Sequence, residues 1–324
     1  GCMHKAARLW VCGPRAGRPR RAAVGIGDGC AVWTPLSGHQ MVFSADMLVE
    51  GRHFLSTVNP RALGHKALAV NLSDLAACGA TPRAFLLSLA LPQVDEAWLS
   101  GFSEGLLALA DAHGCELIGG DTTQGPLNLA ITVIGEVPFG QSILRSGAQP
   151  GDDLYVSGHL GDARLALEAF RGLSLPQAVF DLARSRMETP SPRIALGQAL
   201  RGVASAMADI SDGLLGDLGH ILKASGVGAE IELTGLRDVM LTAKLWACPP
   251  DVHRTCVLSG GDDYELVFTA PAHLRDRVQA VAHASDTLVT HIGRITQADT
   301  LVLRDASGQV VPCDLSSYDH FASP

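Results

Sequence analysis

The sequence has little of what several large classes of protein require. No stretch of about 18 consecutive apolar residues is present, so we expect no membrane-spanning helix. Aromatic residues make up only 5% of the chain, and the 25 basic residues are outnumbered by 33 acidic ones. A nucleic-acid-binding protein needs a basic face to neutralise phosphates, so that class is not favoured.

Cysteine patterns that mark disulfide frameworks and zinc sites are also missing. The eight cysteines include no C-x-x-C pair and no Cys/His cluster with zinc spacing. The first residues do not contain the apolar segment of a signal peptide. We therefore expect single thiols in a reducing, cytoplasmic environment.

Three familiar nucleotide-binding signatures do not occur. The chain contains neither G-x-x-x-x-G-K-[ST] nor the H-R-D and D-F-G pair of protein kinases. The glycine-rich segment at 25–29 lacks the third glycine of a dinucleotide fingerprint, and no clear strand precedes it. Any nucleotide site must therefore be of another type.

The composition predicts a globular α/β (α+β) protein. Apolar residues reach 47%, charged residues only 18%, and 35 glycines allow many turns. A length of 324 residues favours two domains, and the turn-rich segment 146–151 is the expected boundary. We predict a variable arm over 1–23, an N-terminal domain over 24–148 and a C-terminal domain over 149–324. The basic arm is a solvated tail or a lid that brings arginines to phosphates.

Strands and helices are expected to alternate. Gln40–Ser44 predicts a short strand that leads into an acidic turn at Asp46. Asn59-Pro60 predicts a helix start, as does Asp95. A strand at 116–118 is expected to end in a Gly-Gly-Asp turn. Further strands are predicted at 84–91, 127–137, 154–157, 205–210 and 264–269, with helices from 162, from 213 to 225 and over 273–284, and a hairpin over 301–311.

Aspartates recur in or beside Gly/Ser-rich segments. They are Asp28, Asp46, Asp74, Asp121, Asp209, Asp212, Asp262 and Asp263. Each alone could serve local turn hydrogen bonds, and Asp212 could cap a helix. Several converging carboxylates would repel one another and require cations. Carboxylate and hydroxyl oxygens suit Mg²⁺, which binds through a few carboxylates, water and substrate phosphates.

These segments together resemble the thiamine-monophosphate kinases. That family is related to aminoimidazole ribonucleotide synthetase, selenophosphate synthetase and a hydrogenase maturation protein. The matching blocks are GIGDGCAV (25–32), SADMLVEGRHF (44–54), NLSDLAACGATP (71–82), LIGGDTT (117–123), RSGAQPGD (145–152), DISDGL (209–214), SGGDDYEL (259–266) and YDHF (318–321). The E-G-x-H-F and aromatic-D-H-F blocks favour the thiamine phosphate branch.

The resemblance implies a two-domain fold like that of aminoimidazole ribonucleotide synthetase. Its N-terminal α/β domain would bind ATP and magnesium and pair with a second copy in a homodimer. The active site would lie in the cleft between the N-terminal and C-terminal domains. The implied magnesium ligands, for several ions, are Asp28, Ser44, Asp46, Asp74, Asp121, Asp209 and Asp212. The implied contacts to ATP are Gly120, Asp121, Arg145 and Ser211. The implied contacts to thiamine phosphate are His53, Asp262 and Tyr318.

The implied reaction is direct transfer of the γ-phosphate of ATP to thiamine phosphate, giving thiamine diphosphate. An acceptor phosphate is already ionised near neutral pH, so no residue is assigned as an acid or base. Catalysis would rest on positioning, on Arg145 and on Mg²⁺, with K⁺ as a candidate further cation. No nucleic acid or membrane partner is expected.

Four positions depart from the family pattern. Gly29 replaces a second aspartate, Ala45 a hydroxyl residue, Gln124 an arginine and Asp262 a glutamate. Two alternatives therefore stay open beside the kinase. One is a related ATP-using enzyme with another phosphorylated acceptor, and the other is a non-catalytic nucleotide-binding protein.

Overall fold

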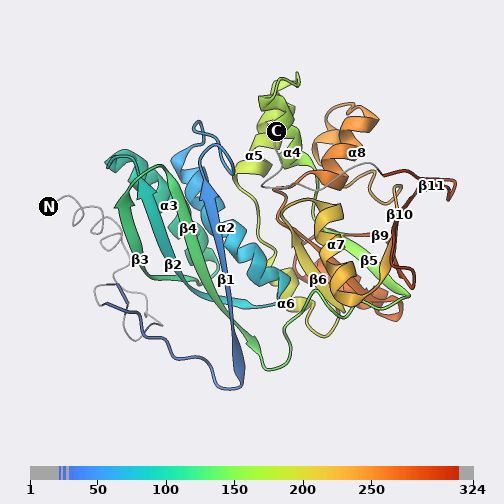
Figure 1. Ribbon diagram of the computed structural model, residues 1–324, viewed down its shortest axis with the longest axis horizontal. Helices are drawn as coiled ribbons and strands as arrows, with labels where there is room; N and C mark the ends of the chain where they lie inside the picture. Colours follow the sequence, from blue (N-terminus) through green and yellow to red (C-terminus); the bar gives the residue numbers. More distant parts are fainter. Residues whose placement is uncertain (1–21, 23–24, 27–28, 314–324) are drawn as a thin grey trace. The chain divides into compact units, whose positions relative to one another are not determined.

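The structure is a computed structural model that describes residues 22, 25–26 and 29–313. Two predicted site residues, Asp28 and Tyr318, lie outside the described residues. The chain divides into two compact units (Figure 1). Of the described residues, unit 1 comprises those up to residue 75 and those over 80–140, and unit 2 comprises 76–79 and those from 141 onward. Each unit has its own sheet, and each is described by itself.

Unit 1 is a four-stranded sheet with two long helices on one face (Figure 1). Its elements are β1 (His39–Val49), α2 (Pro60–Ala77), β2 (Thr81–Leu91), α3 (Glu96–Ala112), β3 (Glu116–Gln124) and β4 (Asn128–Pro138). The strand order is β1-β4-β2-β3, so β1 and β3 form the two edges. Only β2 and β3 are parallel; the other pairs are antiparallel.

Both predicted helix starts in unit 1 are confirmed. The side chain of Asn59 accepts a hydrogen bond from Arg61 N at 2.9 Å, and Pro60 occupies the first helical position. Asp95 is the N-cap of α3 and accepts from the backbone N–H groups of Ala97 and Trp98. These bonds satisfy donors that a helix leaves unpaired at its start.

Two predicted turns are wrong, because both segments continue as strands. Asp46 lies within β1, where it pairs with Ile131 of β4, and β1 runs on to Val49. Asp121 lies within β3, where it pairs with Ser88 of β2. Pairing with a neighbouring strand outweighs the low strand preference of aspartate and glycine.

Unit 2 is built on a seven-stranded mixed sheet in the order β11-β10-β7-β9-β5-β8-β6 (Figure 1). Its strands are β5 (Asp152–Ser157), β6 (Ala206–Ile210), β7 (Gly228–Glu232), β8 (Glu265–Pro271), β9 (Val289–Thr296), β10 (Leu301–Arg304) and β11 (Val310–Val311). Its α-helices are α4 (Asp162–Phe170), α5 (Gln177–Glu188), α6 (Ile194–Ala199), α7 (Leu214–Ser225), α8 (Pro250–Ser259) and α9 (Arg275–Ala284). Two 3₁₀ turns, η1 (Thr242–Lys244) and η2 (Ala272–Leu274), complete it.

Helices α5, α6 and α8 and strands β7 and β9 were not predicted from the sequence, whereas β5, β6, β8 and α7 lie where expected. The buried central strands form one core with the inward faces of α4, α5, α7 and α8. Among the described residues, no helix is long and apolar enough to cross a membrane.

Helices α2 and α3 approach each other through two glycines. A Cβ atom on Gly105 would lie 1.8 Å from Arg61 O, and one on Gly64 would lie 2.0 Å from Phe102 O. Neither backbone oxygen can move away without shifting its helix. The close crossing therefore depends on the absence of a side chain at these two positions.

Replacing Gly105 by alanine tests this crossing. In most helix interiors Gly→Ala stabilises by about 1 kcal/mol, but at Gly105 we expect a loss of about 1–3 kcal/mol from overpacking. The free energy of unfolding in urea measures the change. Gly219→Ala in α7 is the matched control, because a Cβ there meets nothing within 4 Å and should stabilise. An equal gain in both variants would contradict the close crossing.

Candidate active site

Three of the predicted ligands of unit 1, Ser44, Asp46 and Asp74, lie where β1 packs against α2. Ser44 Oγ donates a short hydrogen bond to Asp74 Oδ2. The backbone N–H of Asp46 donates to Asn71 Oδ1 at 3.0 Å, and Asn71 is only 1% exposed. Asn71 Nδ2 in turn donates to Ala67 O within the helix. Helix α2 thus fixes both oxygen-bearing residues of β1, and sequence reasoning did not single out Asn71.

His53 follows β1 in a tight turn. Its ring atom Nδ1 accepts a hydrogen bond from Val49 N at 3.0 Å, and its backbone N–H donates to Val49 O at 3.0 Å. Because Nδ1 is an acceptor here, the neutral ring carries its proton on Nε2. The ring orientation is therefore set by the backbone of the preceding strand.

Asp121 is not brought together with Asp46 within one sheet. Across the four strands, Asp46 pairs in one row of neighbouring residues with Ile131, Leu87 and Gly120. Asp121 belongs to the next row along the strands, which also contains Met47. Adjacent rows point to opposite faces of a sheet. Asp46 and Asp121 also lie on opposite edge strands, three strand spacings or about 14 Å apart.

Gly120 lies directly before Asp121 and requires the absence of a side chain. Its φ is +143°, and a Cβ there would lie 1.8 Å from Leu87 O. The strand can therefore pass close to β2 only with glycine at this position. Asp121 itself is exposed and accepts a hydrogen bond from Thr122 N at 2.8 Å.

In unit 2, the segment 209–213 carries three predicted residues at the end of β6. Asp209 is buried within the strand, and Ser211 and Asp212 follow it in a turn. One oxygen of Asp217 accepts from both Ser211 N and Asp212 N at 3.0 Å. Burial, together with the charge of Asp212, raises the pKa of Asp217 to about 6. Asp217, in the first turn of α7, therefore fixes the backbone conformation of this turn.

The segment 260–264 packs against that turn and contains Asp262. Asp262 and Tyr264 have φ values of +70° and +51°, a region that costs non-glycine residues about 1–2 kcal/mol each. Their backbone N–H groups donate to Ser211 O and Ile210 O, both at 2.8 Å. The unusual backbone therefore persists because it is bonded to the neighbouring turn.

Two buried carboxylates support the 260–264 segment: Asp263, one of the recurrent aspartates to which no specific role was assigned, and Glu265, which the sequence did not single out. Asp263 accepts twice from Gly161 N, at 3.0 and 3.1 Å, and burial raises its pKa well above the ordinary value. Glu265 is 1% exposed and accepts from Ser157, Arg186 and Arg193. Burial favours a higher pKa for Glu265, but the two guanidinium groups bring it below the ordinary value.

Arg145 lies in the segment that leads into β5. It is exposed, and its carbonyl oxygen accepts a hydrogen bond from Ser225 Oγ at 3.1 Å. Nearby Gly147 has a φ of +122° and lies against Ser205 O, so the segment has a fixed path. A long cation on a held backbone suits binding of an anion.

The donors present fit a magnesium ion better than a zinc ion. Near the Ser44–Asp74 pair the donors are carboxylate and hydroxyl oxygens, the type that Mg²⁺ prefers. The described part of the chain contains no group of three or more His, Cys, Asp or Glu side chains able to hold a metal.

Comparison with known proteins identifies the family. Residues 27–137 match the AIR synthase related protein N-terminal domain, and residues 149–306 match the C-terminal domain. The thiamine-monophosphate kinase of Escherichia coli K12 is 44% identical over 303 residues, covering 93% of both chains. The chain belongs to the thiamine-monophosphate kinase family.

Solved structures of family members agree with this placement and with the expected two-domain fold. The enzyme from Stenotrophomonas maltophilia K279a has a TM-score of 0.84 and 40% identity, covering 96% of this chain and 97% of its own. AaThiL complexed with AMPPCP and TMP has a TM-score of 0.76 and 28% identity, covering 89% of both chains. The predicted family and fold class are confirmed.

Substitution of Glu265 by glutamine tests how much the buried carboxylate contributes to the stability of the protein. We expect a loss of about 3–5 kcal/mol in unfolding free energy, because two largely buried arginines lose their counter-charge. Chemical denaturation measures it. Glu168→Gln is the control, since Glu168 also pairs with two arginines but at the surface, where about 0–1 kcal/mol is expected. Equal losses would contradict a special role for burial.

Proposed function

We propose that this chain transfers the γ-phosphate of ATP directly to thiamine phosphate, giving thiamine diphosphate. The observation that carries the proposal is the match to thiamine-monophosphate kinases over nearly the whole chain. A relative that holds AMPPCP, an ATP analogue, together with TMP supports ATP as co-substrate and thiamine phosphate as acceptor. A reaction that consumes ATP favours the cytoplasm as its location.

Magnesium would be held by the oxygen donors of both units. In unit 1 these are Ser44, Asp46 and Asp74, and in unit 2 Asp209 and Asp212; Asp28 and Asp121 complete the proposed set. The bound ions would neutralise the charge of the two anionic substrates. The short Ser44–Asp74 hydrogen bond supports this, because it holds two oxygens of the required type together. K⁺ remains a candidate further cation.

The other proposed site residues bind and orient the substrates. Arg145 would supply a fixed cation to the triphosphate, and Ser211 and Gly120 would contact it through small groups. His53 would donate from Nε2–H to the acceptor, consistent with its Nδ1 being an acceptor. Asp262 and Tyr318 would complete the acceptor contacts. No residue need remove a proton, because the attacking phosphate oxygen is already ionised.

A coupled assay tests the reaction. With ATP, Mg²⁺ and thiamine phosphate, we expect equal formation of ADP and thiamine diphosphate, abolished by EDTA and restored by Mg²⁺. Asp209→Asn removes a charge at nearly constant volume and should lower kcat/KM by about 100-fold or more. Asp181→Asn, at an exposed position of α5, is the control. Turnover of only another phosphorylated acceptor would favour a related ATP-using enzyme over a thiamine-monophosphate kinase. ATP binding without any turnover would favour a non-catalytic nucleotide-binding protein.

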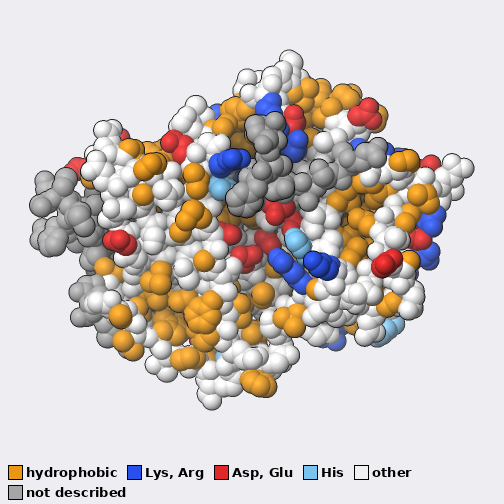
Figure 2. Space-filling model, viewed as in Figure 1, with side chains coloured by type: hydrophobic (Ala, Val, Ile, Leu, Met, Phe, Trp, Pro, Cys, Tyr) orange, Lys and Arg blue, Asp and Glu red, His pale blue; other side chains and the backbone are white. Residues whose placement is uncertain are grey.

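A homodimer is proposed from the sheet face that carries Asp121. On this face Phe43 is 62% exposed and Met47 57% exposed. Figure 2 shows hydrophobic side chains gathered over this part of unit 1. Exposed apolar patches of this kind mark association surfaces. A second copy would cover the patch and bring its own Asp121 near it.

Substitution of Phe43 by aspartate tests the homodimer. A charge in the apolar patch should shift the protein from dimer to monomer, measured by light scattering coupled to size exclusion. Val94→Asp is the matched control, because Val94 is also an exposed apolar residue but lies outside β1. A monomeric parent protein, or unchanged dimerisation of Phe43→Asp, would contradict the proposal.

A further inference from the structure

Lysine 66 is an unusual residue for its position in α2. The helix consists largely of buried apolar residues, yet Lys66 is 2% exposed and is among the largest fully buried side chains of the described residues. A buried ammonium group is costly unless it is hydrogen-bonded, and lysine is seldom buried. A leucine or methionine would fill the same space without that cost.

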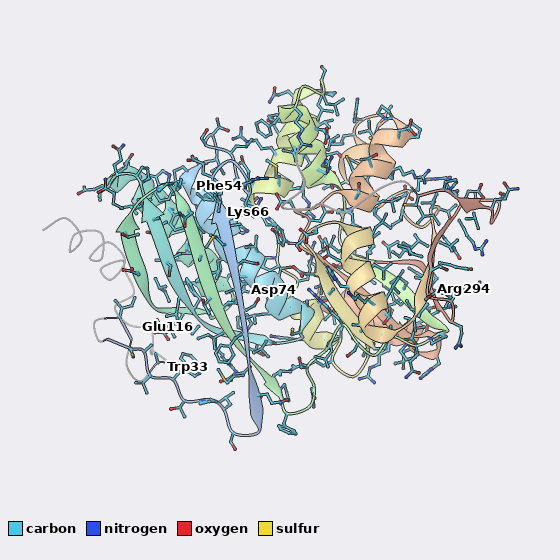
Figure 3. All side chains as sticks on the ribbon, in the orientation of Figure 1. Trp33, Phe54, Lys66, Asp74, Glu116 and Arg294 are labelled. Carbon is cyan, nitrogen blue, oxygen red and sulfur yellow. The ribbon has the colours of Figure 1, made fainter. Side chains whose placement is uncertain are left out.

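The ammonium group of Lys66 is directed at the turn that carries His53. Lys66 Nζ donates to His53 O at 3.2 Å. Figure 3 shows Lys66 beside Phe54, the residue that follows His53, with Asp74 further along the same helix. A charge-assisted hydrogen bond of this kind is about twice as strong as a neutral one.

The turn itself needs such support because its backbone is tightly folded. Gly51 has a φ of +79°, and its N–H donates to Phe54 O at 2.8 Å. Arg52 and His53 both donate their N–H groups to Val49 O. The imidazole of His53 then folds back onto Val49 N. Lys66 donates to the backbone carbonyl of His53 from the helix side of this turn.

We propose that Lys66 is a positioning residue that sets the His53 ring for the phosphorylated acceptor. The inference rests on the proposed function, in which His53 contacts thiamine phosphate. Asn71 and Asp74 of the same helix hold the backbone of Asp46 and the hydroxyl of Ser44. Lys66 extends this support to the acceptor side, so its loss affects acceptor binding before it affects ATP.

The first test is Lys66→Met, which keeps the apolar stem and removes the charge. We expect KM for thiamine phosphate to rise about tenfold, with KM for ATP and kcat changed less than about twofold. The same substitution in a His53→Ala background should leave KM for thiamine phosphate almost unchanged, because the ring it positions is gone. An undiminished effect in that background, or equal changes in both KM values, would overturn the inference.

If Lys66→Met does not fold, a second variant tests whether the conformation of the turn controls KM for thiamine phosphate. Gly51→Ala strains the turn without a clash, since a Cβ there meets nothing within 4 Å. We expect it also to raise KM for thiamine phosphate selectively. Gly38→Ala is the matched control, with a φ of +73° and equally open space, and should leave both KM values unchanged. Gly51→Ala indistinguishable from Gly38→Ala would overturn the inference.

The two proposals fail in different ways. An inactive parent protein, with thiamine phosphate and ATP both present, would refute the proposed kinase function. An active parent whose Lys66 and Gly51 variants show no selective change in KM for thiamine phosphate would refute only the role of Lys66.

Discussion

The pairing of β1 with β4 decides on which face of the sheet each candidate ligand of unit 1 lies. Eleven residue pairs fix this register, from His39 with Pro138 to Val49 with Asn128. Side chains alternate along a strand, so a slip by one residue would turn Ser44 and Asp46 away from α2. It would also bring Phe43 and Met47 against the helix. The contacts from Asn71 and Asp74 are possible only in the observed register.

The same alternation places the candidate ligands of unit 1 on two opposite faces of the sheet. Ser44 and Asp46 face α2, and one chain supplies the side chains that fix them. Asp121 lies on the other face and on the opposite edge strand. Ala45, one of the four positions expected to depart from the family pattern, also points to that face, because it neighbours Ser44 in β1. The departure at Ala45 therefore leaves the Ser44–Asp74 pair intact.

Local signals in the sequence predicted both helix starts of unit 1 and several buried strands, but they missed α5, α6, α8, β7 and β9. Asn59-Pro60 and Asp95 act through bonds to residues two or three positions away, which a short sequence window contains. Asp46 and Asp121 were expected in turns because their strand character comes from partners far along the chain, Ile131 and Ser88. Glu265 and Asp217 fell within or beside recognised segments, but their donors could be identified only once the fold was known. The positions of Asp28 and Tyr318 stay predictions.

The polar side chains of α2 show how a buried helix can serve a surface site. Lys66, Asn71 and Asp74 interrupt a segment that would otherwise pack well with apolar residues alone, and burying polar groups costs free energy unless each is bonded. Their partners are three separate points: the carbonyl of His53, the N–H of Asp46 and the hydroxyl of Ser44. All three points belong to β1 or to the turn that follows it. A rigid helix that bonds a strand at two places and the following turn at a third limits their movement more than loop contacts could, and phosphoryl transfer depends on such positioning.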